Sequence, residues 1–486
     1  MFFTNVKESG LESLLVNWLV NHNGYEQGQN RDYNTEYALD TTRLFRFLKN
    51  TQPDAVKKRQ LEANPQKTAQ LLARVRDEIT KRGIVDVLRK GIKAYPASLI
   101  MFYMTPSVNN PAAAALYAKN IFSVTRQLHF SPDATKLSLD LCIFVNGLPV
   151  ITFELKNQLT KQNVDDAQVK FCTRLQGKES WFLPFNKGYK DGAGNPPNPD
   201  GLMTDYLWKQ VLTKDMLSRI IENYATLVEE KDEETGKTRY KQIFPRYHQL
   251  TAVESLLADV KKNGVGNRYL IQHSAGSGKS NSIAWLAHQL TGLEDAQGNL
   301  LVDSVIVVTD RVVLDKQIRD TIRQFAQTRN IIAWAEHSGD LRKAIEDGRR
   351  IIITTIEKLP YVLPEIGEDH KDRHFAIIID EAHSSQNGKT AGTMNMTLSA
   401  IMSDPDMDNE DKINAMCEGK KLLTNASYFA FTATPKNKTL ETFGTAYEDA
   451  GVIKHRPFHV YTMKQAIQEG FILDVLKYYT PIDSYY

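Results

Sequence analysis

The second half of the sequence contains five short, continuous apolar runs, each followed at once by a polar loop. Runs of this length, rich in β-branched residues, are typical of strands buried on both faces of a parallel sheet. Helical patterns separate them, so the order of elements predicts an α/β domain. Ligands of such sheets bind at the carboxyl ends of the strands, where we therefore expect functional residues. The predicted strands are Tyr269–Gln272, Val305–Thr309, Ile351–Thr354, Phe375–Ile379 and Tyr428–Phe431.

The loop after the first strand has the composition of a phosphate-binding loop. It reads His273-Ser-Ala-Gly-Ser-Gly-Lys-Ser280 and precedes a predicted helix, Asn281–Leu290. Glycines let backbone N–H groups turn toward phosphate oxygens, and the helix N-terminus favours the same anion. Lys279 would contact the β- and γ-phosphates, and Ser280 would ligate Mg²⁺. The strict pattern has glycine where this chain has His273. The predicted nucleotide-binding residues of the loop are Gly276, Ser277, Gly278, Lys279 and Ser280.

Two carboxylates follow the fourth strand, in the segment Asp380-Glu-Ala-His383. A carboxylate at a strand end can hold the Mg²⁺ of a bound nucleotide, and its neighbour can orient the attacking water. We therefore predict Lys279, Asp380 and Glu381 as catalytic residues, with Ser280 and Asp380 as metal ligands. Two acids that merely cap a strand are disfavoured, because the phosphate loop lies about 100 residues upstream on the same predicted sheet.

These segments and Thr432-Ala-Thr-Pro435 resemble motifs I, II and III of superfamily 2 helicases and translocases, including the histidine that opens motif I. The resemblance implies an adenine-recognising segment at Pro245–Leu250, with Gln249 at the base edge and Arg246 in the same site. It further implies DNA contacts at Asp310-Arg311 and Thr355–Lys358. The cofactors would be ATP and Mg²⁺.

The motor of this family needs two RecA-like lobes, with ATP bound between them. We expect the first lobe at residues 226–455 and the start of a second at 456–486, which the sequence does not complete. A chain of this kind should bind ATP but translocate poorly or not at all. The segment 384–420 between motifs II and III is longer than a usual loop, and its role stays open.

The first half of the chain contains an apolar hairpin with charged residues in its strands. Asn146-Gly147, the strongest short hairpin signal, separates the runs Leu137–Val145 and Leu148–Lys156. Asp140 lies in the first run, and Glu154 and Lys156 share one face of the second. Two carboxylates there could hold Mg²⁺, while the lysine positions water or stabilises developing charge. Surface ion pairs are the alternative, since Glu-x-Lys occurs in nearly every protein.

The register of this hairpin tests the metal hypothesis. A regular two-residue turn would pair Asp140 with Phe153 and leave Glu154 on the other face of the sheet. A shared metal requires Asp140 opposite Glu154, and this needs one extra residue in one strand. We therefore predict a bulged turn, or an equivalent irregularity, in the hairpin.

The arrangement Asp…Glu-x-Lys resembles the PD-(D/E)xK nuclease fold, which implies metal ligands Glu12, Asp140 and Glu154. Glu12 borders an amphipathic helix and is otherwise an exposed helix acid. The restriction (R) subunits of type I restriction–modification enzymes, which this chain resembles, also often carry Gln-x-x-x-Tyr after the nuclease motif; Gln168 is therefore a plausible site residue, although Cys172 stands in place of the tyrosine. The helix's apolar stripe is Leu11, Leu14, Leu15, Trp18 and Leu19, and the predicted catalytic residues are Asp140, Glu154, Lys156, Gln168, Lys279, Asp380 and Glu381.

Such a nuclease ahead of a superfamily 2 motor resembles the restriction (R) subunit of type I restriction–modification enzymes. The predicted fold class is α/β, with a mixed-sheet nuclease domain and connector at residues 1–225 followed by a parallel RecA-like lobe. The resemblance implies ATP-driven translocation and cleavage of double-stranded DNA, with methyltransferase (M) and specificity (S) subunits as partners. The alternatives are a stand-alone helicase or repair translocase with a DNA-binding N-terminal domain, and a nucleotide-gated scaffold with an inactive nuclease.

Composition excludes several other classes. The net charge of +2 gives no global signature of nucleic-acid binding, although a basic channel could still exist. No apolar run approaches the roughly 18 residues of a membrane span, and no signal peptide is apparent. We expect a soluble, cytoplasmic protein without membrane contact. Its cysteines, Cys142, Cys172 and Cys417, lack metal-ligand spacing and are expected to be reduced thiols.

Overall fold

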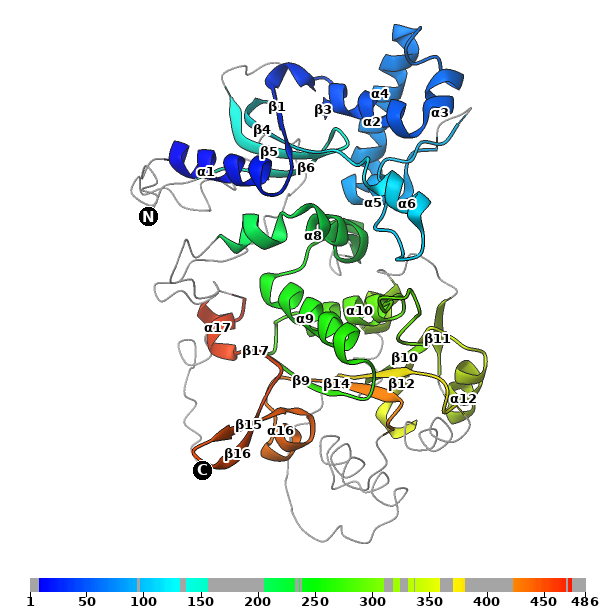
Figure 1. Ribbon diagram of the computed structural model, residues 1–486, viewed down its shortest axis with the longest axis vertical. Helices are drawn as coiled ribbons and strands as arrows, with labels where there is room; N and C mark the ends of the chain where they lie inside the picture. The colour runs from blue at the N-terminus through cyan, green and yellow to red at the C-terminus, as the bar shows by residue number, and fades with distance from the viewer. Residues whose placement is uncertain are drawn as a thin grey trace. The chain divides into compact units, whose positions relative to one another are not determined.

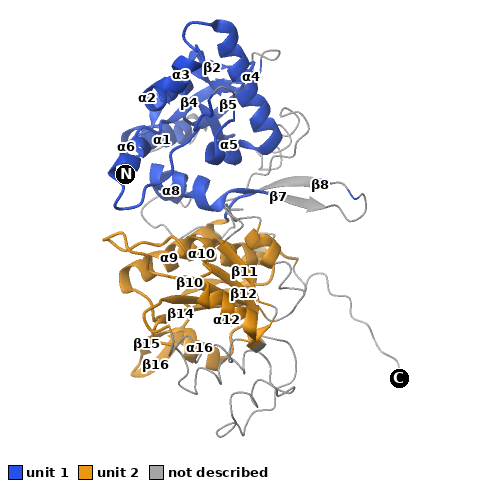
Figure 2. Cartoon of the chain, turned by 90° about the vertical axis from the view of Figure 1, so that its right-hand side faces the viewer, with its two compact units in different colours: residues 1–184, 197–245 blue, residues 185–196, 246–486 orange. Residues whose placement is uncertain are grey.

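The computed structural model forms two compact units, one ending at Pro245 and the other continuing from Arg246 (Figures 1 and 2). Strands β7 (Thr226–Lys231) and β8 (Thr238–Ile243) form an antiparallel hairpin. Because β7 contacts α5 (Ile84–Lys90), this hairpin belongs to the first unit, beyond the expected boundary at 225. The described residues are 8–93, 97–131, 137–155, 205–231, 236, 238–309, 318–323, 331–335, 337–358, 370–380, 423–468 and 471–473.

The first unit contains a mixed four-stranded sheet in the order β1-β4-β5-β6. The first pair is parallel and the other two are antiparallel. One apolar core joins β4 and β5 to the helix α1 through residues such as Leu19, Val124 and Ile143. The elements are α1 (Glu8–Asn21), β1 (Glu26–Gly28), β4 (Phe122–His129), β5 (Ser138–Val145) and β6 (Leu148–Phe153).

Four of the remaining helices described in this unit, α2, α4, α6 and α8, begin at a residue whose side chain caps the helix. The Asp40 side chain accepts a hydrogen bond from Arg43 N at the start of α2, and Asn64 caps α4 in the same way. Gly83, with φ of 79°, ends α4. The elements are η1 (Asn30–Asp32), β2 (Tyr33–Asn34), β3 (Leu39–Asp40), α2 (Thr41–Thr51), α3 (Pro53–Lys58), α4 (Pro65–Arg82), α6 (Pro111–Tyr117), η3 (Leu207–Val211), α8 (Lys214–Arg219) and η4 (Ile220–Tyr224).

The second unit is built on a seven-stranded sheet in the order β11-β12-β10-β13-β14-β9-β17, with every neighbouring pair parallel. All five predicted strands are present, so the parallel α/β prediction is confirmed. The strands are β9 (Arg268–His273), β10 (Ser304–Thr309), β11 (Ile332–Trp334), β12 (Ile351–Thr355), β13 (Phe375–Ile379), β14 (Ala426–Thr432) and β17 (His459–Tyr461).

Strand β17 was not predicted, and it begins after residue 456, where the start of a second lobe was expected. It lies parallel to β9 at the edge of the same sheet, with Tyr461 opposite His273. The amide of Phe458 also donates to Leu270 O at 2.9 Å. The other elements are α9 (Tyr247–Asn263), α10 (Lys279–Leu290), α12 (Ser338–Glu346), η6 (Ile356–Lys358), α16 (Asn437–Phe443), β15 (Thr445–Asp449), β16 (Val452–Arg456) and α17 (Met463–Gln468).

None of the helices in the described part of the chain is long and apolar enough to cross a bilayer.

Candidate functional sites

The predicted phosphate loop joins β9 to α10, the strand–loop–helix context that such a loop requires. Gly278 has φ of 80° at the N-cap of α10, and a Cβ there would lie 2.5 Å from Gln249 Nε2. Gly276 has φ of 71°, and its Cβ would lie 2.5 Å from Ile472 Cγ2. Both positions therefore need glycine for backbone angle and for space.

Lys279 and Ser280 form the first turn of α10, so both stand at the end of the loop. Lys279 Nζ donates to His273 O at 3.4 Å, which places the ammonium group over its own loop. Ser277 is fully buried, and its amide donates to Ser274 O at 3.3 Å, which closes the loop on itself. The backbone is thus curled as an anion cradle requires.

Asp380 directly follows β13, at the same carboxyl edge of the sheet as the phosphate loop. Strand β14 lies between β13 and β9, so the two strand ends are roughly 10 Å apart. Asp380 is only 6% exposed, and its amide donates to Val308 O at 2.9 Å. Strand β14 ends at the buried Thr432 of motif III. Glu381 lies outside the described residues.

Gln249 and Arg246 both contact the phosphate loop. The Gln249 amide Nε2 donates to Gly278 O at 2.9 Å, while its Oε1 accepts from Arg246 N at 2.9 Å. Arg246 Nη1 donates to Gly276 O at 3.3 Å, and its guanidinium lies 3.7 Å above the Phe471 ring. In this arrangement the Gln249 amide holds the loop, and its contact with a base stays a prediction.

A cluster of aromatic rings lies behind the loop, and sequence reasoning missed it. His248 Nε2 is 3.0 Å from Ser277 O, and His273 Nε2 is 2.9 Å from His459 Nδ1. Ser274 N donates to Tyr461 O at 3.0 Å, which ties β17 to the loop. The only sequence signal was the short run Phe458–Tyr461, too brief to mark a strand by itself.

Burial lowers the pKa of every histidine in this cluster. The pKa of His248 falls to about 3 and that of His459 to about 4, in both cases mainly through desolvation. The pKa of His273 is held well below 6.5 by burial and by the neighbouring histidines and Lys279. All three rings are therefore neutral at pH 7.

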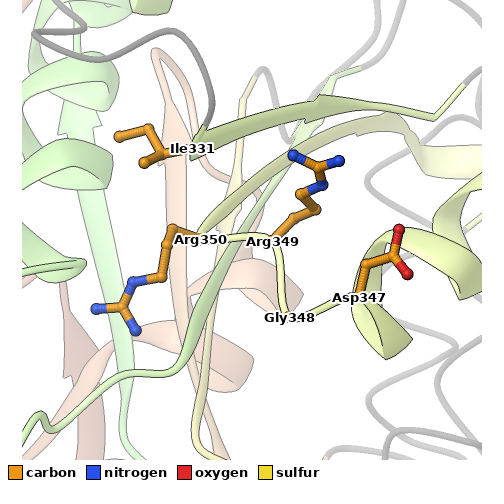
Figure 3. A pocket seen from close by; sticks show the side chains of 5 residues that line it. All are labelled: Ile331, Asp347, Gly348, Arg349 and Arg350. Atoms are coloured by element: carbon orange, nitrogen blue, oxygen red, sulfur yellow. The ribbon is translucent and has the colours of Figure 1, made fainter.

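An open cavity of about 360 Å³ lies elsewhere in the second unit (Figure 3). It is formed where the chain enters β11 and β12, and so at the amino ends of these strands. The phosphate loop lies at the carboxyl edge, so this cavity is separate from the nucleotide site. Its lining residues are Ile331, Asp347, Gly348, Arg349 and Arg350.

The hairpin of the first unit has the irregularity that the metal hypothesis required. Asn146 and Gly147, with φ of 52° and 83°, form a two-residue turn and pair Val145 with Leu148. The register then shifts between Ile143 and Phe144, so that Ile143 pairs with Ile151. The predicted bulge is confirmed, although it lies beyond the turn. The last pair of this ladder is Leu141 with Phe153. The same register, extended by one residue, would bring Asp140 opposite Glu154.

Two of the predicted ligands, Glu12 and Asp140, are linked by Gln127, and the backbone next to the third, Glu154, contacts Asp140. Leu155 N donates to Asp140 Oδ2 at 2.5 Å, which brings the chain at Glu154 beside Asp140. Gln127 Nε2 lies 3.4 Å from Asp140 Oδ1 and 3.0 Å from Glu12 Oε2. Glu12 is only 6% exposed, unlike an ordinary helix acid.

Arg126 and Gln127, which sequence reasoning missed, hold the Glu12 carboxylate. Arg126 Nε donates to Glu12 Oε1 at 2.6 Å, and Gln127 donates to Oε2. Within the described ranges, no group of three or more His, Cys, Asp or Glu side chains is arranged to hold a metal. The predicted Lys156 and Gln168 lie outside those ranges, so the full ligand set stays a prediction.

The fold and loop geometry of the second unit are those of an ATPase lobe, and comparison with known families agrees. Residues 248–484 match the SWI2/SNF2 ATPase family, and residues 5–186 match the N terminus of type I restriction enzyme R proteins (HSDR_N). The chain thus joins an R-protein N-terminal domain to a SWI2/SNF2-type ATPase domain. It belongs to the R (HsdR) subunit family of type I restriction enzymes.

Curated relatives align with most of this chain. A type I restriction enzyme endonuclease subunit of Staphylococcus aureus is 24% identical over 74% of the chain and 36% of the relative. The HindI endonuclease subunit of Haemophilus influenzae is 25% identical over 74% and 35%. A putative subunit of Methanocaldococcus jannaschii is 23% identical over 82% and 38%. The chain therefore spans about a third of the length of these relatives.

Two solved structures show only a distant likeness. A fragment of a putative HsdR subunit from Vibrio vulnificus is 14% identical, with a TM-score of 0.28, over 69% of this chain and 51% of that chain. A SWI2/SNF2 ATPase core from Sulfolobus solfataricus, in complex with double-stranded DNA, is 20% identical, with a TM-score of 0.26, over 40% and 34%. Both TM-scores are below 0.5, so neither defines a shared overall fold.

Proposed function

We propose that this chain is the nuclease and motor portion of an R subunit that translocates double-stranded DNA with ATP and then cleaves it. The observation that supports the nuclease part is the hairpin register. Leu141 pairs with Phe153, so Asp140 and Glu154 are the next residues along the two strands, and Gln127 donates to both Asp140 and Glu12. A regular hairpin would have separated the two carboxylates onto opposite faces. The first unit would then be a PD-(D/E)xK-type domain within residues 1–225.

The donor set suits Mg²⁺, which prefers carboxylate oxygens. Glu12, Asp140 and Glu154 would hold the ion. The buried Glu12 carboxylate accepts one hydrogen bond from Arg126 and one from Gln127, and these keep it oriented. A bound Mg²⁺ would supply Lewis acidity at the scissile phosphate. Lys156 would position the attacking water, and Gln168 would line the same site.

In the second unit, the proposed nucleotide-binding roles belong to the phosphate loop and to the residues around it. Backbone amides of Gly276, Ser277 and Gly278 would receive the phosphates, with Lys279 against the β- and γ-phosphates. Ser280 and Asp380 would hold Mg²⁺, and Glu381 would orient the hydrolytic water. Arg246 and Gln249 would complete the nucleotide site, since both already contact the loop.

The partners of such a subunit would be double-stranded DNA and the M and S subunits, which read the DNA sequence. The match of residues 5–186 to the N terminus of type I restriction enzyme R proteins supports this assembly. Cytoplasmic DNA and ATP would be its substrates.

The test is Mg²⁺-dependent cleavage of double-stranded DNA by the complete enzyme, assembled with M and S subunits. Wild type is compared with Glu154→Ala and Asp140→Asn. We expect both variants to lose at least a hundredfold in cleavage, because each removes a metal ligand, while ATP hydrolysis continues. Asp77→Asn, an exposed acid of the same unit, is the matched control and should cleave normally. Full cleavage by Asp140→Asn would rule out Asp140 as a metal ligand, whereas no cleavage by the wild-type enzyme would favour a translocase with a DNA-binding N-terminal domain.

A further inference from the structure

Gln127 has a backbone conformation that its strand does not require. The ladder between β4 and β5 pairs Arg126 with Leu141 and Leu128 with Leu139, yet Gln127 between them has a left-handed φ of 46°. Such a conformation costs a residue other than glycine about 1 kcal/mol or more. The Gln127 side chain is exposed, so core packing does not account for it. Strain of this kind persists where the surrounding contacts fix it.

Both the nitrogen and the oxygen of the Gln127 side-chain amide form hydrogen bonds with neighbouring side chains. Nε2 carries two hydrogens, and the two acceptors within reach are Glu12 Oε2 at 3.0 Å and Asp140 Oδ1 at 3.4 Å. Oε1 accepts from Ser138 Oγ at 2.9 Å, which fixes which end of the amide faces the carboxylates. One nitrogen thus lies between two acids that come from different elements, α1 and β5.

The side chain of Asn30 holds the backbone from Gln127 to His129. Asn30 Nδ2 donates to Gln127 O at 3.0 Å, and Asn30 Oδ1 accepts from His129 N at 2.8 Å. One asparagine side chain therefore holds the backbone that follows the strained residue at two points. The bracing keeps the amide aimed at Glu12 and Asp140 rather than at solvent.

We propose that Gln127 is a positioning residue for the divalent cation of the proposed nuclease site. Its amide nitrogen donates to both carboxylates and so keeps Glu12 and Asp140 facing the place where the cation would bind. Without the amide, two carboxylates facing each other would turn apart, because like charges repel. The inference rests on the proposed function, since it assigns Gln127 to that same site.

The experiment measures binding of Mn²⁺, a paramagnetic substitute for Mg²⁺, to the full chain without nucleotide. Gln127→Ala removes the amide and keeps the strain, whereas Gln127→Gly removes the amide and relieves the strain. Loss of a residue that orients metal ligands typically weakens metal binding 10–100-fold, and we expect about tenfold for both variants. The glycine variant should unfold at the wild-type temperature or above it, because glycine adopts positive φ freely.

Two results would overturn the inference. One is Mn²⁺ binding of wild-type strength in both variants. The other is restored binding in Gln127→Gly alone, which would assign the effect to the backbone and not to the amide. Asp140→Asn separates this from the proposed function. If Asp140→Asn changes neither Mn²⁺ binding nor DNA cleavage, the proposed nuclease site is wrong, and so is the role proposed for Gln127. If Asp140→Asn abolishes both and the Gln127 variants change nothing, only the inference fails.

Discussion

The ring of His248 lies flat against the ring of Tyr461, with centroids 3.6 Å apart and planes 6° from parallel. His248 also contacts Ser277 O, and Tyr461 accepts from Ser274 N through its backbone. Two elements, α9 and β17, are thus joined to each other and to the phosphate loop between them. The loop's shape depends on residues almost 200 positions downstream, which suggests the following predictions.

Replacing Tyr461 with leucine should loosen the phosphate loop. Tyr461 is 1% exposed, and an aromatic pair contributes about 0.5–1.5 kcal/mol beyond its buried area. We expect Tyr461→Leu to lower the unfolding free energy of the second unit by about 2 kcal/mol and to weaken ADP binding. Tyr461→Phe keeps the ring and should lose less on both measures. Thermal unfolding with and without ADP is the measurement, and equal behaviour of the two variants would contradict the prediction.

The neutral histidines should make the second unit sensitive to acid. The folded-state pKa values of His248 and His459, about 3 and about 4, lie below the unfolded value of 6.5. As the pH falls below 6.5 the unfolded chain binds protons first, so stability is complete above 6.5 and declines toward pH 4. Urea unfolding between pH 7.5 and 4.5 would show the decline. His459→Asn removes one of these protons and should have a shallower dependence, and an unchanged slope would argue against this cause.

Gln249 offers a test of loop-holding against base recognition. In Gln249→Glu a carboxylate oxygen replaces the Nε2 donor and faces Gly278 O, which lies 2.9 Å from that nitrogen. Leaving such a group unpaired costs about 1–3 kcal/mol, so nucleotide affinity should fall about tenfold or more. Gln249→Ala should lose less, since it brings no repulsion.

The same variants separate the two roles when ATP and GTP are compared. A residue that only holds the loop contributes equally to both nucleotides, so Gln249→Ala should weaken both to the same extent. A selective loss of ATP affinity would assign Gln249 to the base edge instead.

The sequence predicted the motor sheet well, for a physical reason. Strands such as β10 and β13 are buried on both faces, so their apolar runs are unbroken and their bounds were found to within a residue. Strands β11 and β17 are three residues long and only partly buried, and they depend on their neighbours for pairing. Motif spacing located the loop, but contacts such as His273–His459 join distant residues and leave no local pattern.

In the first unit, the requirement for a shared metal site predicted more of the hairpin than the secondary-structure propensities of its residues did. The need to bring Asp140 opposite Glu154 predicted an irregular hairpin, but not its place beyond the turn. The turn itself stays regular because Asn146 is buried, with Oδ1 accepting from Ile121 N at 2.7 Å and Nδ2 donating to Met101 O at 2.9 Å. Gln127 was missed because strand alternation carries no sign of a left-handed residue.

The tightness of that turn leads to a prediction about stability. Gly147 has φ of 83°, and a Cβ there would lie 2.4 Å from Asp40 O and 2.7 Å from Leu44 N. Both neighbours are backbone atoms at the start of α2, so neither can move without disturbing the helix. Gly147→Ala should therefore destabilise the first unit by at least about 3 kcal/mol, from strained φ and overlap together.

Gly236 provides the matched control for this substitution. Its φ is 64°, but a Cβ there would meet nothing within 4 Å. Gly236→Ala should therefore show the cost of positive φ alone, about 1–2 kcal/mol. Urea unfolding of the two variants, followed by a probe in the first unit, gives the comparison. Equal losses would contradict the prediction, because they would mean that the hairpin and α2 separate at little cost.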